Sequence, residues 1–209
     1  MFVGDGTTAN SLGPATLNAT GVVLEGGRAF SGGGLATLGS KASIWIGGES
    51  KVFGNYARSA GGGLIVEGAA VATLSKSRLE ENTANNDIGG GAVASGGGKF
   101  VATESYIERN VALKGGGVAV KGCGSQFTSI KSYISSNTAT QYGGGGVFIV
   151  GTNLGGLDIL ARVNSFVAID SFLNDNIAIA GRGGGIFAEH NSFINVTNSF
   201  IRNNKAYLF

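Results

Sequence analysis

Apolar and polar positions along the chain follow a short repeat and not a helical period. The pattern Ser-x-aliphatic-x-x-Asn-x-Ala occurs six times, with the same residue types at its four fixed positions. Successive copies are separated by 27, 28, 27, 39 and 28 residues. A short, nearly constant period predicts one structural unit per repeat. The repeated asparagines are Asn55, Asn82, Asn110, Asn137, Asn176 and Asn204.

A degenerate copy of the pattern precedes the first full one. Leu24, Gly27 and Ala29 stand in its aliphatic, asparagine and alanine places. We therefore expect residues 1–31 to form a degenerate first coil. The one long interval predicts an insertion near residues 152–163.

Each repeat contains three short stretches of strand composition, separated by turns rich in Gly, Asn and Ser. One follows a glycine triplet, one precedes the repeated serine of the pattern, and one starts at that serine. No window combines helical periodicity with caps and sufficient length. The strands after the triplets are expected to begin at Leu35, Leu64, Ala92, Val118, Val147 and Ile186.

A fixed short period of strands without helices predicts a solenoid in which each repeat is one coil. We expect an all-β, right-handed, single-stranded parallel β-helix of about six to seven coils, forming one domain over residues 1–209. The last copy ends just before Phe209 without a capping helix, so we expect a segment of a longer solenoid or one that stacks end to end.

Equivalent residues of successive coils should form columns along the axis. Alternation within strands predicts an inward column five residues before each serine. Its members are Trp45, Ala72, Phe100, Phe127, Phe166 and Ile194. The three consecutive phenylalanines should stack face to face inside the solenoid.

The repeated asparagines are expected to form a structural ladder. Each can adopt left-handed geometry at a turn, and its amide can hydrogen-bond the same amide one coil above and below. The glycine triplets indicate positive φ angles or corners too tight for a Cβ atom.

The residues just before the serines predict a charged outer column. They are Glu49, Lys76, Glu104, Lys131, Asp170 and Asn198. Because the signs alternate, like charges are not neighbours in this column, which favours one stacking register.

A second outward column suggests a contact surface. Lys51, Arg78 and then four aromatic residues precede the buried aliphatic positions: Tyr106, Tyr133, Phe172 and Phe200. A further outward column ends in Phe148 and Phe187. Exposed apolar strips of this kind usually mark an interface. The alternative is that a loop, such as the insertion near residues 152–163, folds over them.

Composition and charge argue against several classes of protein. Charged residues make up 13% of the chain, whereas hydrophobic residues reach 43%, which argues against disorder. The 15 basic and 13 acidic residues are scattered, so we expect no nucleic-acid partner. Apolar runs are too short for a membrane helix, and the N-terminal residues lack the features of a signal peptide. One Cys and one His cannot build a zinc site, and we expect no metal or cofactor.

Candidate catalytic groups are sparse. The aspartates form neither a pair nor a column, and Glu189-His190 is the only neighbouring acid and imidazole. The Gly-rich run 181–185 precedes a predicted strand, whereas a phosphate loop needs a helix there. We therefore expect no catalytic residues. Asn18 and Asn195 lie in glycosylation sequons, which matter only in a pathway that glycosylates.

The repeat resembles that of the chlamydial-type polymorphic outer-membrane proteins. Their Gly-Gly-Ala-Ile-like element is matched by the glycine triplets followed by Leu, Ala, Val or Ile, and their Phe-x-x-Asn element by Val52-x-x-Asn55 and the five later copies. An aliphatic residue replaces the Phe throughout. The resemblance covers about residues 20–209 and implies a pectin-lyase-like β-helix displayed at a cell surface.

These observations predict a non-enzymatic structural or adhesive domain of a surface or extracellular protein. We expect a protein or glycan partner along the side face, end-to-end self-association into filaments, and no direct membrane insertion. The alternative is a carbohydrate-binding or polysaccharide-degrading β-helix.

Overall fold

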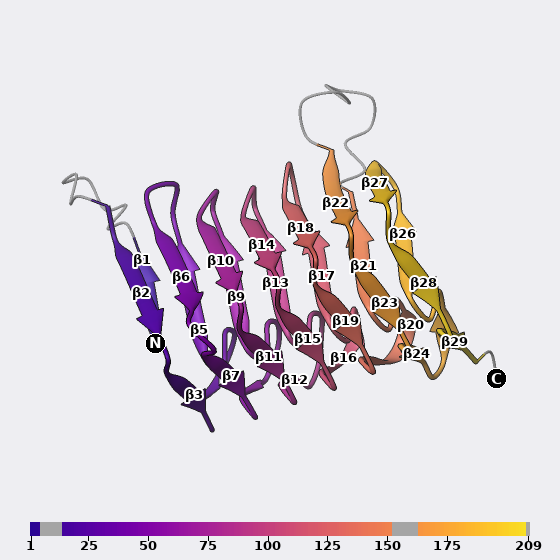
Figure 1. The fold of residues 1–209 in the computed structure, drawn as a ribbon, viewed down its shortest axis with the longest axis horizontal. Coiled ribbons are helices and arrows are strands. Elements are labelled where there is room, and N and C mark those ends of the chain that lie inside the picture. The colour runs from indigo at the N-terminus through magenta and orange to yellow at the C-terminus, as the bar shows by residue number, and fades with distance from the viewer. Residues whose placement is uncertain (5–13, 152–162, 208–209) are drawn as a thin grey trace.

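The computed structural model describes residues 1–4, 14–151 and 163–207. Every regular element in these ranges is a β-strand, and the strands wind into a stack of parallel coils (Figure 1). The predicted all-β solenoid is confirmed. The described residues contain no helix that is long and apolar enough to cross a membrane.

Each complete coil contributes one strand to each of four parallel sheets, which we call A to D. Sheet A contains β1 (Phe2–Gly4), β5 (Leu35–Leu38), β9 (Leu64–Glu67), β13 (Ala92–Ser95), β17 (Val118–Lys121), β21 (Val147–Val150) and β26 (Ile186–Glu189). Sheet B contains β2 (Thr16–Thr20), β6 (Ser43–Gly47), β10 (Val71–Ser75), β14 (Lys99–Thr103), β18 (Gln126–Ile130), β22 (Asn164–Ile169) and β27 (Ser192–Thr197).

The other two sheets consist of shorter strands. Sheet C contains β3 (Val23–Glu25), β7 (Lys51–Phe53), β11 (Arg78–Glu80), β15 (Tyr106–Glu108), β19 (Tyr133–Ser135), β23 (Phe172–Asn174) and β28 (Phe200–Arg202). Sheet D contains β4 (Arg28–Ala29), β8 (Tyr56–Ala57), β12 (Thr83–Ala84), β16 (Val111–Lys114), β20 (Thr138–Gly143), β24 (Ile177–Ala178), β29 (Lys205–Ala206) and β25 (Gly181–Arg182), which pairs with β20.

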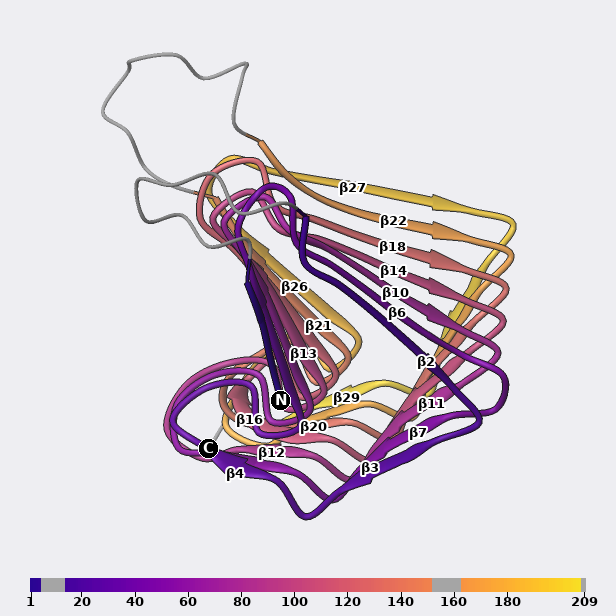
Figure 2. The same ribbon diagram turned by 90° about the vertical axis from the view of Figure 1, so that its left-hand side faces the viewer.

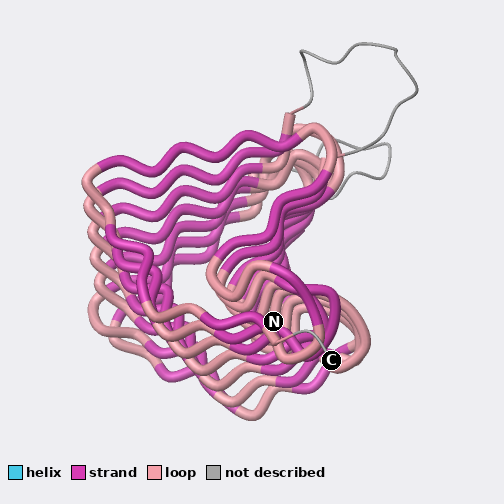
Figure 3. Tube along the Cα trace, turned by 90° about the vertical axis from the view of Figure 1, so that its right-hand side faces the viewer, coloured by secondary structure: helices cyan, strands magenta, loops and turns pink. Residues whose placement is uncertain are grey.

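Successive coils superimpose when the solenoid is viewed along its axis (Figures 2 and 3). Sheets A, B and C enclose the interior, and the loops that lead from sheet D to sheet A form a rounded lobe beside it (Figure 2). The six strands after the glycine triplets begin at the residues that the sequence predicted. Leu24 and Ala29 pair with Val52 and Ala57, so the degenerate copy occupies the expected places in the columns.

Aromatic stacking fills the centre of the solenoid. The ring centroids of Phe100 and Phe127 lie 5.2 Å apart, those of Phe127 and Phe166 lie 5.1 Å apart, and both pairs are nearly parallel. All three side chains are fully buried. The predicted phenylalanine column is confirmed, and it adds ring stacking to the burial of apolar surface.

The first member of that column was predicted wrongly. Ile44, and not Trp45, pairs with Ala72 and points inward, whereas Trp45 pairs with Thr73 on the outer face and is 37% exposed. The turn before Ser50 is one residue longer than its counterparts in later coils. Counting back from the serine therefore lands one residue too late, which reverses the face of the side chain.

A second apolar cluster lies outside sheet A. Ile65, Val93, Ala119 and Phe148 are buried there together with Ala60 and Ile88 from the sheet D to sheet A loops. The prediction that Phe148 belongs to an exposed contact surface is therefore wrong, since its side chain is 3% exposed. Phe187, the next member of the column, is half-buried. The loops that contain Ala60 and Ile88 therefore pack on the outer face of sheet A. The insertion near residues 152–163 falls almost wholly outside the described residues.

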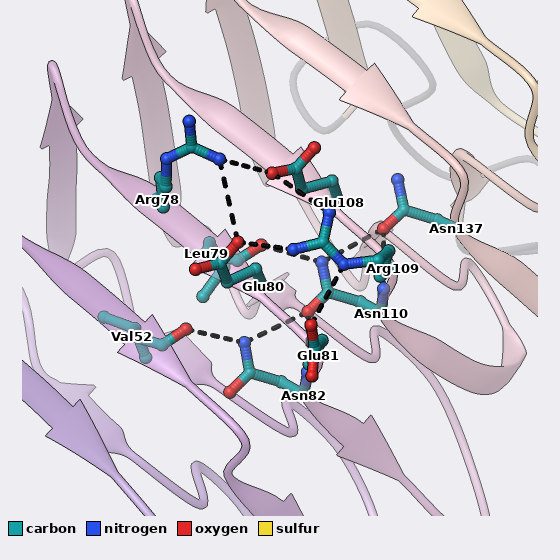
Figure 4. Close-up of polar contacts among 10 residues, drawn as sticks. All are labelled: Val52, Arg78, Leu79, Glu80, Glu81, Asn82, Glu108, Arg109, Asn110 and Asn137. Carbon is teal, nitrogen blue, oxygen red and sulfur yellow. Dashed lines mark hydrogen bonds and ion pairs between the residues drawn. The ribbon is translucent and has the colours of Figure 1, made fainter.

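The asparagine column forms a continuous ladder at the corner between sheets C and D. The Nδ2 amide of Asn82 donates to Oδ1 of Asn110 at 3.0 Å and to the carbonyl oxygen of Val52 at 2.9 Å (Figure 4). The same bonds recur at each Asn from Asn55 to Asn176. The expected amide ladder is present, and it satisfies backbone groups that a corner would leave unpaired.

The left-handed geometry expected of these asparagines is found one residue earlier. Glu81, Arg109, Ser136, Asp175 and Asn203 have φ angles between 54° and 57°. Gly26 and Gly54 take this position in the first two coils. The asparagine itself keeps ordinary backbone angles, because its role is to bond the neighbouring coils. The first glycine of each triplet also has a positive φ, as predicted.

The repeated serines form a second buried ladder at the corner between sheets B and C. The backbone N–H of Ser105 donates to Oγ of Ser132 at 3.0 Å, and that Oγ donates to the carbonyl oxygen of Ile130 at 2.8 Å. Similar bonds link Ser77 to Ser105 and Ser171 to Ser199. Both fixed polar positions of the repeat are therefore explained by corner hydrogen bonds.

Candidate functional site

The outer face of sheet C carries the aromatic residues that the sequence predicted as a contact surface. Strands of this sheet direct two side chains each toward the outer face, so the face consists of two columns. The first column runs Lys51, Arg78, Tyr106, Tyr133, Phe172, Phe200. The second runs Phe53, Glu80, Glu108, Ser135, Asn174, Arg202.

Four aromatic rings of the first column form one stack, which we call the aromatic ladder (Tyr106, Tyr133, Phe172 and Phe200). Neighbouring ring centroids lie 5.0, 4.8 and 5.3 Å apart, and the rings are within 12° of parallel. The first three side chains are half-buried, and Phe200 is 56% exposed. This part of the predicted contact surface is at the molecular surface.

The orientation of the rings decides what they can offer to a ligand. Their faces are occupied by the neighbouring rings, and Arg78 covers the outer face of Tyr106 with its guanidinium carbon 4.5 Å from the ring centroid. The ladder therefore presents ring edges to solvent along most of its length. Ring edges carry the positive end of the aromatic quadrupole, so they suit apolar groups and hydrogen-bond acceptors.

An ion cluster occupies the second column and the adjoining corner. Arg109 contacts Glu80 at 2.7 Å, Glu81 at 3.0 Å and Glu108 at 3.3 Å, and Arg78 contacts Glu108 at 2.7 Å (Figure 4). The Glu80 side chain is only 7% exposed. Glu80 and Glu108 are in-register neighbours, so their like charges would repel if the two arginines did not compensate them.

The same contacts perturb the arginine. Burial alone would lower the pKa of Arg109, but its hydrogen bond to Glu81 and the charges of Glu108 and Glu80 raise that pKa above the ordinary arginine value. The carboxylates of Glu80 and Glu108 are thus held by guanidinium groups on the outer face of sheet C. The repeat does not indicate this cluster, because the hydrogen-bonded partners lie 28 to 30 residues apart at positions outside the fixed pattern.

One buried polar atom lies beside the aromatic ladder. Asn174 is on the same strand and the same face as Phe172, and its side chain is largely buried. Its Oδ1 accepts no hydrogen bond from any described residue. This oxygen is shielded from solvent, and a buried acceptor left unpaired costs about 1–3 kcal/mol.

The charged outer column has the predicted order, and its residues also share a left-handed backbone conformation that the sequence did not indicate. Glu49, Lys76, Glu104, Lys131 and Asp170 all have positive φ angles, between 47° and 64°. The Lys76 ammonium lies 3.8 Å from the Glu104 carboxylate, and both are exposed, so the pair contributes little. The column borders a shallow hollow of about 380 Å³ that also reaches Tyr106.

The other predicted positions lie apart from this face. Asn18 and Asn195 are exposed on sheet B. Glu189 ends β26, and His190 follows it in a turn with a φ angle of 54°. The strand β26 follows the glycine run 181–185, as expected. Among residues 1–4, 14–151 and 163–207, no three His, Cys, Asp or Glu side chains gather as metal ligands would.

Comparisons with protein-family models, with curated proteins and with solved structures find no match to this chain. The resemblance to polymorphic outer-membrane proteins therefore stays a prediction from the repeat.

Proposed function

We propose that this protein is a non-enzymatic structural or adhesive β-solenoid of an extracellular or surface-exposed protein, and that it binds a protein partner through the outer face of sheet C. The observation that carries the proposal is the aromatic ladder. Four stacked and partly exposed rings make an apolar strip along the solenoid, and strips of this kind usually serve as interfaces.

Ring orientation favours a protein over a glycan as the partner. Sugars pack against ring faces, and here the faces of Tyr133 and Phe172 are covered by their neighbours in the stack. Protein side chains can pack against the ring edges that the ladder presents to solvent.

The ion cluster supports a structural role beside the aromatic ladder. Glu80 and Glu108 each contact two guanidinium groups, which compensates the like charges of these in-register neighbours. This arrangement stabilises the sheet beside the aromatic ladder.

The test compares wild-type protein with the double substitution Tyr133→Ser and Phe172→Ser. Beads coated with either protein are passed over immobilised proteins and over immobilised neutral and acidic polysaccharides. We expect wild-type beads to be retained on at least one protein surface and the variant to lose most of that retention. A matched control replaces the exposed Lys99 and Gln126 of sheet B by Ser, which should leave retention unchanged.

Circular dichroism of both variants shows whether the solenoid is intact. Equal retention of wild-type and ladder variant would contradict the proposal. Retention on polysaccharide alone would favour the carbohydrate-binding alternative, and release of reducing ends from the polysaccharide would favour the degrading enzyme.

A further inference from the structure

A second surface feature lies on the opposite side of the coil, outside sheet A. A hollow of about 330 Å³ separates the outer face of β5, β9 and β13 from the loops of the lobe. Leu38, Ile65 and Ala60 give it an apolar floor and wall, and Glu67, Ser95 and Lys121 give it polar groups. It is independent of the aromatic ladder on sheet C.

Three of the polar residues that line the hollow are consecutive members of one column. Ser95 pairs in register with Glu67 on one side and with Lys121 on the other. All three side chains therefore leave the sheet on its outer face. Neighbouring strands lie about 4.8 Å apart, which sets the spacing of the three groups.

Two of these groups lack partners among the described residues. Ser95 is only 4% exposed, yet its Oγ makes no hydrogen bond there. Lys121 is compensated, because its ammonium lies 3.5 Å from the Asp87 carboxylate of the lobe. Glu67 forms no ion pair within residues 1–4, 14–151 and 163–207. The hollow thus combines a buried unpaired hydroxyl with an uncompensated carboxylate.

We propose that this hollow binds a primary ammonium group attached to an apolar stem. An ammonium carries three donors and no acceptor, so it can donate to the Glu67 carboxylate and, once Ser95 turns its solvent-shielded Oγ toward the hollow, to that oxygen as well. Two hydrogen bonds of about 2.8 Å from one tetrahedral nitrogen span nearly the distance between neighbouring strands. The stem then lies on Leu38 and Ile65.

The neighbouring rung shows how this face holds such a group. Lys121 already places an ammonium beside a carboxylate of the lobe, one coil beyond Ser95. A ligand ammonium between Glu67 and Ser95 would form a similar contact. In that contact the sheet would supply the carboxylate and the ligand would supply the ammonium. The ammonium can come from a free alkylamine or from a lysine side chain of another protein.

The experiment titrates the ¹⁵N-labelled protein with n-pentylammonium and follows the backbone amide signals of Glu67 and Ser95 by NMR. Neutral 1-pentanol is the matched control ligand, and an acetylated, amidated Gly-Lys-Gly peptide distinguishes a protein lysine from a free amine. We expect saturable shifts with the ammonium and little shift with the alcohol. If the peptide binds as well as the amine, the source is a protein lysine, and if it fails, the source is a free amine.

Two substitutions and a control make the assignment specific. Glu67→Gln should weaken binding at least about tenfold, as expected for a lost hydrogen bond to a charged group. Ser95→Ala should weaken it about threefold without lowering the melting temperature, because the hydroxyl has no partner in the free protein. Glu25→Gln on sheet C is the control and should bind normally. Equal binding of pentanol, or unchanged binding by Glu67→Gln, would overturn the proposal.

Discussion

The side-chain amide of Asn82 lies between two coils and bonds both of them. It donates to Val52 O of the preceding coil at 2.9 Å and to Oδ1 of Asn110 in the following coil at 3.0 Å. The backbone N–H of Asn82 donates to the same Oδ1 at 2.9 Å. Every amide in the ladder points its donors the same way, so each coil fixes the register of the next.

Asn110→Ala should lower the free energy of unfolding by at least about 3 kcal/mol. The change removes the acceptor of two Asn82 donors and the donor to Leu79 O, and all three groups are buried. Urea unfolding followed by circular dichroism measures the loss. The control is Asn85→Ala in the exposed lobe, for which we expect a change within about 0.5 kcal/mol. Similar losses for both variants would mean that the ladder adds no stability of its own.

Because Ile44 and not Trp45 points inward, alanine substitutions at these two neighbouring residues should differ in their cost to stability. Ile44 is fully buried, so Ile44→Ala should cost about 2–5 kcal/mol, as other buried isoleucines do. Trp45 lies on the outer face and packs over Gly47, so Trp45→Ala should cost less despite the larger side chain. The midpoints of urea unfolding of the two variants measure the difference. A larger loss of stability for Trp45→Ala than for Ile44→Ala would mean that Trp45 points inward.

Lys131→Gly should raise stability, by about 1 kcal/mol. The residue has a φ angle of 48° in an exposed turn, and side chains other than Gly and Asn are strained there. Lys99→Gly, at an exposed strand position with ordinary backbone angles, should lower stability because glycine gains more freedom on unfolding. Thermal unfolding of both variants should show shifts of opposite sign, and two losses would contradict the explanation.

Arg109→Met should destabilise the fold by about 2 kcal/mol, because it leaves the buried Glu80 carboxylate without its closest cation. The raised pKa of Arg109 stabilises the folded state at every pH below the ordinary arginine value. That contribution is lost only at higher pH, so substitution tests it better than titration does. The double variant Glu80→Met with Arg109→Met should regain most of the loss. No recovery in urea unfolding would show that the two side chains are not coupled.

The coil, the starts of the sheet A strands and the phenylalanine column could be predicted because they depend on residues repeated at a fixed period. Backbone register in a parallel stack places such residues above one another. The position of Trp45 could not be predicted this way, since it depends on one extra turn residue before Ser50.

Features outside the repeat were missed for a different reason. The burial of the apolar cluster outside sheet A depends on loops whose sequences differ from coil to coil, such as those containing Ala60 and Ile88. The Arg109 cluster depends on outward side chains, which vary freely because solvent accepts most of them. Only the stacking of coils brings these residues together.

Methyl-to-methyl NOE contacts test the stacking of equivalent residues most directly. Ile107 pairs with Ile134 on the adjacent coil, and both side chains are fully buried. In protein labelled at isoleucine methyl groups, we expect a strong cross-peak between Ile107 and Ile134, although 27 residues separate them. Absence of that cross-peak in a folded sample would contradict the solenoid and every column derived from it.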